Sequence, residues 1–137
     1  MAVLTRLSMS AKLENLRRFI VSVSDCAKAQ KFEQEKISKI ELATEEALVN
    51  IIRYAYPQGP GDVEMICKME GGRFVIEIID SGIPFDVAAK PDPDVSAGIP
   101  EREPGGLGIF LMKKVMDEVR YRRENDQNIL TLMIQKR

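Results

Sequence analysis

Two runs of alternating apolar and polar residues, 63–69 and 73–80, are separated only by Glu70-Gly71-Gly72. Glycine accepts the positive φ angles of a tight turn, so this pattern predicts a hairpin of two antiparallel strands. A hairpin is only marginally stable alone, because its apolar face needs a second layer to cover it. The rest of the chain must therefore supply that layer.

Two segments before the hairpin carry apolar residues at helical spacing. The first helix is expected to start at a Ser10 cap and to run to about Lys31, and the second to span 34–54. The sequence YPQGPGD, residues 56–62, ends the second helix because proline and glycine do not continue its hydrogen-bond ladder. One stripe of this helix is apolar: Ile37, Ile40, Thr44, Ala47, Leu48, Ile51 and Ala55.

The remaining segments complete a two-layer pattern. Residues 3–7 alternate weakly, which predicts an edge strand, and the proline-containing segment 87–104 predicts a loop. A third helix is expected over 105–119, and a final hairpin of strands 120–124 and 129–135 around NDQN. Because strands and helices cluster rather than alternate, the sequence predicts an α+β fold. It would be a two-layer sandwich whose mixed, mostly antiparallel sheet is covered on one face by helices.

Length and composition narrow the class of protein. A chain of 137 residues with 45% hydrophobic content suits one domain, expected over residues 1–137. Lysine and arginine total 20 against 21 acids, a net charge of -1, so neither a nucleic acid nor a membrane is the expected partner. The two cysteines show no metal spacing, and no apolar run suggests a membrane span or signal peptide, so a cytoplasmic location is expected. The absence of histidine excludes a histidine base or phosphoacceptor within this chain.

The second helix carries Glu46 and Asn50, four residues apart and therefore neighbours on one face. At about 100° per residue they lie nearly opposite the apolar stripe, so they are expected to face away from the core. A solvated helix face is one interpretation. The other is a site in which the amide oxygen ligates a hard cation and the carboxylate accepts a proton.

Two further clusters have a structural and a functional interpretation. Asp80-Ser81-Gly82 ends a strand and suits a turn, but Asp80 is also able to accept a hydrogen bond from the amine of adenine, with Gly82 allowing a flat ring to approach. The stretch 105–108, Gly-Gly-Leu-Gly, suits a hinge, but backbone N–H groups at a helix start also favour phosphate. A P-loop and a dinucleotide fingerprint are both absent.

Taken together, EEALVN, DSGIPF and GGLGIF resemble, in this order, the N, G1 and G2 boxes of the GHKL (histidine-kinase-like) ATPase superfamily. The resemblance spans nearly the whole chain. The small size, the TEEALVN…YAY helix and the GGLGIFLMKKVMDEV segment look most like the anti-sigma-factor serine/threonine kinases of bacterial partner-switching systems.

The resemblance implies ATP and Mg²⁺ as cofactors and assigns a role to individual residues. Glu46 would be the general base, Asn50 the magnesium ligand, and Asp80 with Gly82 the adenine contact. Thr131 matches a family threonine near adenine, although packing within a strand accounts for it equally well, and Arg102 would reach the terminal phosphate or remain a solvated charge. Relatives commonly carry histidine where this chain has Tyr54. The phosphate-binding residues would be Gly105, Gly106, Leu107 and Gly108.

The function that the resemblance implies is a homodimeric protein kinase and anti-sigma factor. It would phosphorylate a serine or threonine of an anti-sigma-factor antagonist, and it would sequester a sigma factor when the antagonist is not available. Two alternatives stay open: a non-catalytic ATP-binding module that acts by sequestration, and the ATPase domain of a split histidine kinase. The segment 87–104 is expected to be a nucleotide lid whose order depends on ATP.

Overall fold

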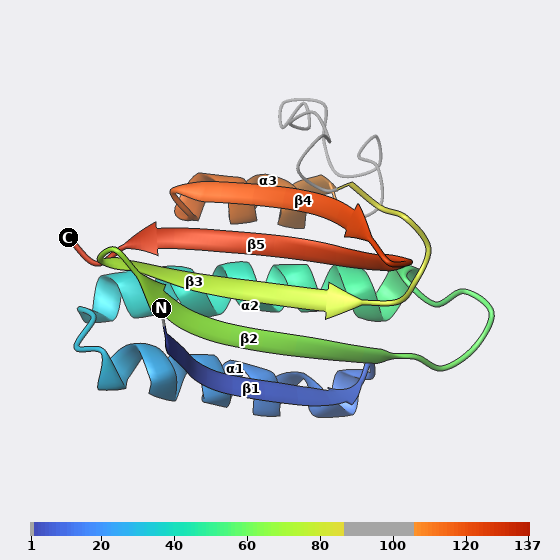
Figure 1. Ribbon diagram of the computed structural model, residues 1–137, viewed down its shortest axis with the longest axis horizontal. Helices are drawn as coiled ribbons and strands as arrows, with labels where there is room; N and C mark the ends of the chain where they lie inside the picture. The colour runs from blue at the N-terminus through green and yellow to red at the C-terminus, as the bar shows by residue number, and fades with distance from the viewer. Residues whose placement is uncertain (1, 87–105) are drawn as a thin grey trace.

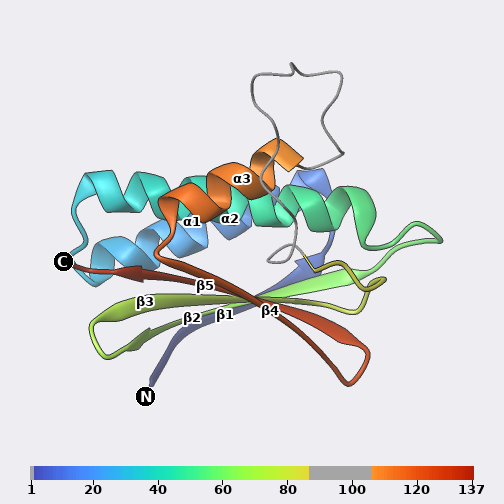
Figure 2. The same cartoon turned by 90° about the horizontal axis from the view of Figure 1, so that it is seen from above.

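The computed structural model describes residues 2–86 and 106–137, and its elements form two layers (Figure 1). Among these residues, five strands form one sheet and three helices lie on one of its faces (Figure 2). The predicted two-layer α+β sandwich is confirmed. In chain order the elements are β1 (Ala2–Ser10), α1 (Leu13–Ala29), α2 (Gln34–Tyr54), β2 (Asp62–Glu70), β3 (Arg73–Asp80), α3 (Gly106–Val115), β4 (Glu118–Glu124) and β5 (Gln127–Gln135).

The strands are arranged in the order β1-β2-β3-β5-β4, and each described pairing is antiparallel. The described part therefore contains none of the parallel pairing that a mixed sheet would have. Strand β5 lies between β3 and β4, and its pairing with β3 puts Arg73 opposite Gln135 and Asp80 opposite Asn128. This register places the end of β3 next to the start of β5.

The core lies between the sheet and the helices. On β3, Phe74, Ile76 and Ile78 alternate with outward-facing residues and are completely buried. They pack in one cluster with the predicted stripe of α2, of which Ile40 and Leu48 are also completely buried. Removing each such side chain from water contributes about 1.5–3 kcal/mol. Helix α3 adds Ile109 and Met112 to the same cluster.

Both tight turns between strands depend on positive φ angles. Gly71 and Gly72 connect β2 to β3 at φ 58° and 82°, which confirms the predicted first hairpin. The second hairpin turns at Asn125 and Asp126, at φ 54° and 60°. Because the turn is this short, β5 begins two residues earlier than predicted.

Two predicted helix boundaries are wrong, because strand pairing takes the place of the helix at each of them. Ser10 does not cap α1 but continues β1, where it pairs with Asp62, and Lys12 takes the cap position without a side-chain bond. Helix α1 ends at Ala29, close to the predicted end at about Lys31, which adopts a left-handed conformation with φ 64°. Helix α3 ends at Val115 rather than at residue 119, because residues 118 and 119 pair with β5.

No helix in the described ranges is both long enough and apolar enough to cross a membrane.

Candidate nucleotide site

Helix α2 carries Glu46 and Asn50 into the region where α3 packs against it. The expectation that both face away from the core is wrong for Asn50, which is only 4% exposed, and Glu46 is half-buried. Helix α2 packs against the sheet and against α3 (Figure 2), and Asn50 lines a cavity together with Met112 of α3. Gly108 of α3 lies so close that a Cβ there would sit 2.2 Å from Glu46 Oε2. The fold therefore joins the acidic helix to the glycine-rich segment, which are far apart in sequence.

The Asn50 amide has one satisfied end and one unsatisfied end. Its Nδ2 donates to the Glu46 carbonyl oxygen at 2.9 Å, whereas its Oδ1 is buried and accepts from no described residue. A buried acceptor without a partner costs free energy, and an amide oxygen is a ligand that Mg²⁺ accepts. The described residues hold no cluster of three acids, cysteines or histidines for a metal. An ion at Asn50 would thus take most of its ligands from phosphate and water, as Mg²⁺ does at nucleotide sites.

The Glu46 carboxyl is placed in an environment suited to proton transfer. Burial raises its pKa, the neighbouring Glu45 charge raises it further, and Arg53 opposes the rise. A raised pKa makes a carboxylate a better proton acceptor near neutral pH. The local chemistry of Glu46 thus fits the predicted general base.

Asp80 ends β3 and is 5% exposed on the helix-facing side of the sheet. Its Oδ1 accepts from the Gly82 backbone N–H at 2.9 Å and from Asn128 Nδ2 at 2.9 Å. Burial raises the pKa of the Asp80 carboxyl, while these two hydrogen bonds and the Arg123 charge act in the opposite direction. None of the described residues donates to Oδ2. One carboxylate oxygen is therefore held by the protein and the other remains for a ligand.

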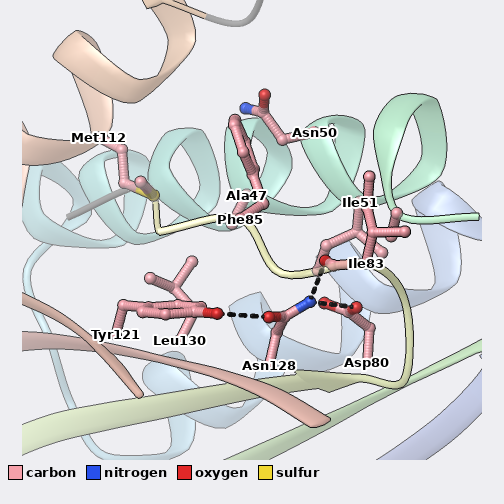
Figure 3. A pocket seen from close by; sticks show the side chains of 11 residues that line it. Ala47, Asn50, Ile51, Asp80, Ile83, Phe85, Met112, Tyr121, Asn128 and Leu130 are labelled. Carbon is pink, nitrogen blue, oxygen red and sulfur yellow. Dashed lines mark hydrogen bonds between the residues drawn. The ribbon is translucent and has the colours of Figure 1, made fainter. Parts of the chain in front are cut away.

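A small cavity joins Asn50 and Asp80 (Figure 3). It encloses about 30 Å³, which is room for water but not for a purine ring. Phe85 is one of the residues that line it (Figure 3). Apart from these polar groups its walls are mostly apolar: Ala47, Ile51, Ala55, Ile83, Met112, Tyr121, Asn128 and Leu130 also line it.

Gly82 packs closely against the C-cap of α2, and its contact with adenine stays a prediction. A Cβ on Gly82 would lie 2.2 Å from the carbonyl oxygen of the cap residue Ala55. The neighbouring Ile83 N–H donates to that same oxygen at 2.9 Å. Gly82 does not line the cavity; it acts on the site through its N–H bond to Asp80.

Thr131, predicted to lie near adenine, does not line the cavity that contains Asp80. On β5, Leu130, Leu132 and Ile134 belong to the core, so Thr131 points to the opposite, helix-free face of the sheet, where it lines a groove with Glu77 and Arg120. The residue of β5 that does reach Asp80 is Asn128. The apolar residues of β5 alternate from Leu130 onward, and the same alternation extended back by two residues reaches Asn128. A polar residue at an apolar position was therefore visible in the sequence.

Other predicted residues have different outcomes. Tyr54 packs its ring beside Phe85, with 6.4 Å between the ring centroids, and does not line the cavity. Gly106 begins α3, and the Leu107 side chain is 38% exposed. Phosphate binding by these residues stays a prediction. Arg102, Gly105 and the segment 87–104 lie outside the described residues.

Residues 9–134 match the family model of the histidine kinase-like ATPase domain. The chain belongs to this family. The match covers nearly the whole chain, and it confirms the resemblance deduced from the three sequence boxes.

Curated relatives of this histidine kinase-like ATPase domain include two serine-protein kinases named RsbW. Those of Bacillus cereus (strain AH820) and Bacillus anthracis (strain CDC 684 / NRRL 3495) are each 25% identical over 128 residues, covering 90% of this chain and 80% of the relative. The relationship to serine-protein kinases is therefore distant.

Solved structures support the fold. The RsbU and RsbW domains of Rv1364c from Mycobacterium tuberculosis superpose with a TM-score of 0.66 at 14% identity, over 96% of this chain and 32% of that one. The chain thus spans about a third of the mycobacterial chain. The SiaB-SiaC complex from Pseudomonas aeruginosa gives a TM-score of 0.64 at 15% identity, covering 96% of this chain and 89% of that one.

Proposed function

We propose that this protein binds Mg-ATP and transfers the γ-phosphoryl group to a serine or threonine of a partner protein. The observation that carries the proposal is the pairing on α2 of two side chains. The buried Oδ1 of Asn50 accepts from no described residue, and the carboxyl of Glu46 has a raised pKa. A cation-binding oxygen and a proton acceptor side by side are what phosphoryl transfer requires of a protein, because most of the catalysis is positioning and charge neutralisation.

Each part of the nucleotide has a proposed location. Asp80 Oδ2 would accept a hydrogen bond from the adenine amine, and the start of α3 near Gly108 would bind phosphate oxygens through unpaired backbone N–H groups. Asn50 would hold the magnesium ion, which when bound neutralises the phosphate charge. Glu46 would accept the proton of the attacking hydroxyl.

The partner is proposed from the relatives. The curated relatives are named serine-protein kinases, which supports a protein hydroxyl as the acceptor. We further propose that the acceptor belongs to an antagonist of an anti-sigma factor, that this chain is that anti-sigma factor, and that it acts as a homodimer. In this scheme phosphorylation of the antagonist leaves the chain free to sequester a sigma factor.

Labelled ATP added with the purified protein to a dialysed extract of the source cells tests the kinase activity. The expected result is one protein-bound label that resists acid, as phosphoserine and phosphothreonine do, and that disappears with Glu46→Gln. General-base removal lowers rates by about 10²–10⁴. Glu35→Gln is the matched control on the same helix, where an exposed carboxylate pairs with Lys39.

The alternatives give different results. Full Mg-ATP binding without any labelled protein would favour the non-catalytic sequestration module. An acid-labile label would indicate a phosphohistidine in another chain and hence the split histidine kinase. Absence of ATP binding would contradict all three functions.

A further inference from the structure

Four polar residues form a hydrogen-bonded cluster at the cavity, of which Asp80, Tyr121 and Asn128 line its wall and Arg123 is bonded to Asn128. Asp80 comes from β3, Asn128 from β5, and Tyr121 and Arg123 from β4. The sheet register brings them together, because Asn128 pairs with Asp80 on one side and with Arg123 on the other. None of Tyr121, Arg123 and Asn128 belongs to the three sequence boxes.

The Asn128 amide is fully bonded. Its Nδ2 donates to Asp80 Oδ1 at 2.9 Å and to the Ile83 carbonyl oxygen at 2.8 Å (Figure 3). Its Oδ1 accepts from the Tyr121 hydroxyl at 2.6 Å and from Arg123 Nη1 at 3.2 Å. Arginine is a donor only, so Arg123 requires the amide oxygen to face it. The amide NH₂ group must then face Asp80.

Arg123 holds a second point of the same turn. Its Nη1 also donates to the Gly82 carbonyl oxygen at 2.7 Å, while the Gly82 N–H donates to Asp80 Oδ1. Arg123 thus fixes Asp80 through both Asn128 and the backbone of the turn. The residue is exposed, so its truncation leaves the core intact.

The consequence is chemical selection at Asp80. Two protein donors occupy Oδ1, whereas no described residue donates to Oδ2, so the ionised carboxylate keeps this oxygen as an acceptor in the wall of the cavity. Such an oxygen attracts the amine at position 6 of adenine and repels the carbonyl oxygen at the same position of guanine. Fixing the carboxylate beforehand removes the entropy cost of orienting it during binding.

We propose that Asn128 and Arg123 are positioning residues that give the site its preference for a 6-aminopurine, by fixing the Asp80 carboxylate with Oδ2 toward the base. This inference rests on the proposed nucleotide-binding function and adds the residues that determine base specificity. Tyr121 supports the same orientation through its bond to Asn128 Oδ1.

The test is a double-mutant cycle. One change removes the 6-amino group from the nucleotide, and the other removes the Asn128 donor from the protein. Calorimetry measures the affinity, with magnesium, of a non-hydrolysable ATP analogue and of the matching purine riboside analogue that lacks the 6-amino group. In the wild type, losing the amine should weaken binding roughly tenfold to a hundredfold, as for a hydrogen bond to a charged group. With Asn128→Leu, of similar size but without donors, the same loss should fall to roughly threefold or less.

A purely structural role would not produce this pattern. Damage to the fold would weaken both analogues equally, leaving the ratio at its wild-type value, and that result would overturn the proposal. Arg123→Ala, on the surface, should also reduce the ratio, and it tests the idea if Asn128→Leu fails to fold. Arg122→Ala is the matched control, since Arg122 pairs with exposed Glu124 and should leave the ratio unchanged.

The pH dependence provides a second readout. Asn128 and Arg123 both help to keep Asp80 ionised, so without them the affinity for the ATP analogue should begin to fall at a higher pH during acidification. An unchanged midpoint together with an unchanged amine ratio would overturn the inference while leaving the nucleotide-binding function intact. Failure of the wild type to bind the ATP analogue would instead contradict the proposed function itself.

Discussion

At the scale of single residues, Glu46 lies in an environment that disfavours its own charge. The half-buried carboxylate packs against Gly108, which leaves it space that any side chain would fill, and the charge of Glu45 is close by. Both effects raise the pKa of Glu46. Perturbed groups of this kind concentrate at functional sites, where stability is given up for chemistry.

Glu46→Gln should therefore increase the free energy of unfolding at neutral pH. The pKa of Glu46 is raised in the folded state, so the stability that this group contributes is complete below the usual glutamate pKa of 4.5 and is lost as the pH rises through the raised value. Glutamine carries no charge and avoids that loss. Urea unfolding at several pH values should show an advantage for the variant near neutrality that shrinks on acidification. An advantage that grows toward acid pH would contradict the raised pKa.

Some residues of the site were predictable from the sequence and others were not. Glu46, Asn50 and Asp80 have side-chain chemistry that suggests their roles in any fold. Asn50 is buried at a cavity that it lines together with Met112 of α3, and a helical wheel of α2 contains no information on this distant segment. Whether Thr131 or Asn128 faces the helices depends on which alternate residues of β5 point to that side of the sheet. A shift of one residue would move every side chain to the other face.

At the scale of elements, the β4–β5 hairpin determines where Asn128 lies. Its two turn residues, Asn125 and Asp126, both adopt left-handed angles, and the turn fixes which residue of β5 faces Asp80. The sequence predicted both strands from their alternation, but it did not predict the turn to two residues. Strand pairing also determines where two helices begin or end. Ser10 pairs with β2 instead of capping α1, and Glu118 pairs with β5 instead of extending α3.

Asp126→Gly should stabilise the protein by about 0.5–1 kcal/mol, because glycine adopts the left-handed region without the steric cost that a Cβ imposes. Chemical denaturation with urea measures the change. Gly72→Ala is the matched comparison in the other hairpin: it lies in open space at φ 82°, so strain alone should destabilise it. A destabilised Asp126→Gly variant would show that the aspartate side chain contributes more than its backbone strain costs.

At the scale of the whole molecule, the sheet order assembles the site. Strand β5 returns beside β3, and α3 lies against α2, so residues 46–50, 80, 108 and 128 converge from four separate segments. Local patterns predict the segments but not their mutual register, which depends on packing between distant parts of the chain. The resemblance of three short boxes to a known superfamily supplied that arrangement; the closed state of the cavity had no signal in the sequence.

Because the site joins elements from both layers, nucleotide binding should stabilise the entire fold. A ligand that binds only the folded state adds about 2.7 kcal/mol at a hundredfold excess over its Kd, which for a domain of this size raises Tm by roughly 10 °C. Thermal unfolding of the wild type with Mg-ATP should show such a shift. GTP should raise Tm much less because Asp80 accepts a hydrogen bond from an amine, and EDTA should reduce the increase in Tm that ATP gives.

Two variants test individual residues of the site, and each variant is compared with its own nucleotide-free Tm. Asp80→Asn should lose most of the shift, and Asn50→Ala should lose its magnesium-dependent part, since the unpartnered Oδ1 is then gone. Equal shifts with ATP and GTP would exclude Asp80 as the base-recognition residue, and a shift in Asn50→Ala that keeps its full sensitivity to EDTA would exclude Asn50 as the magnesium ligand.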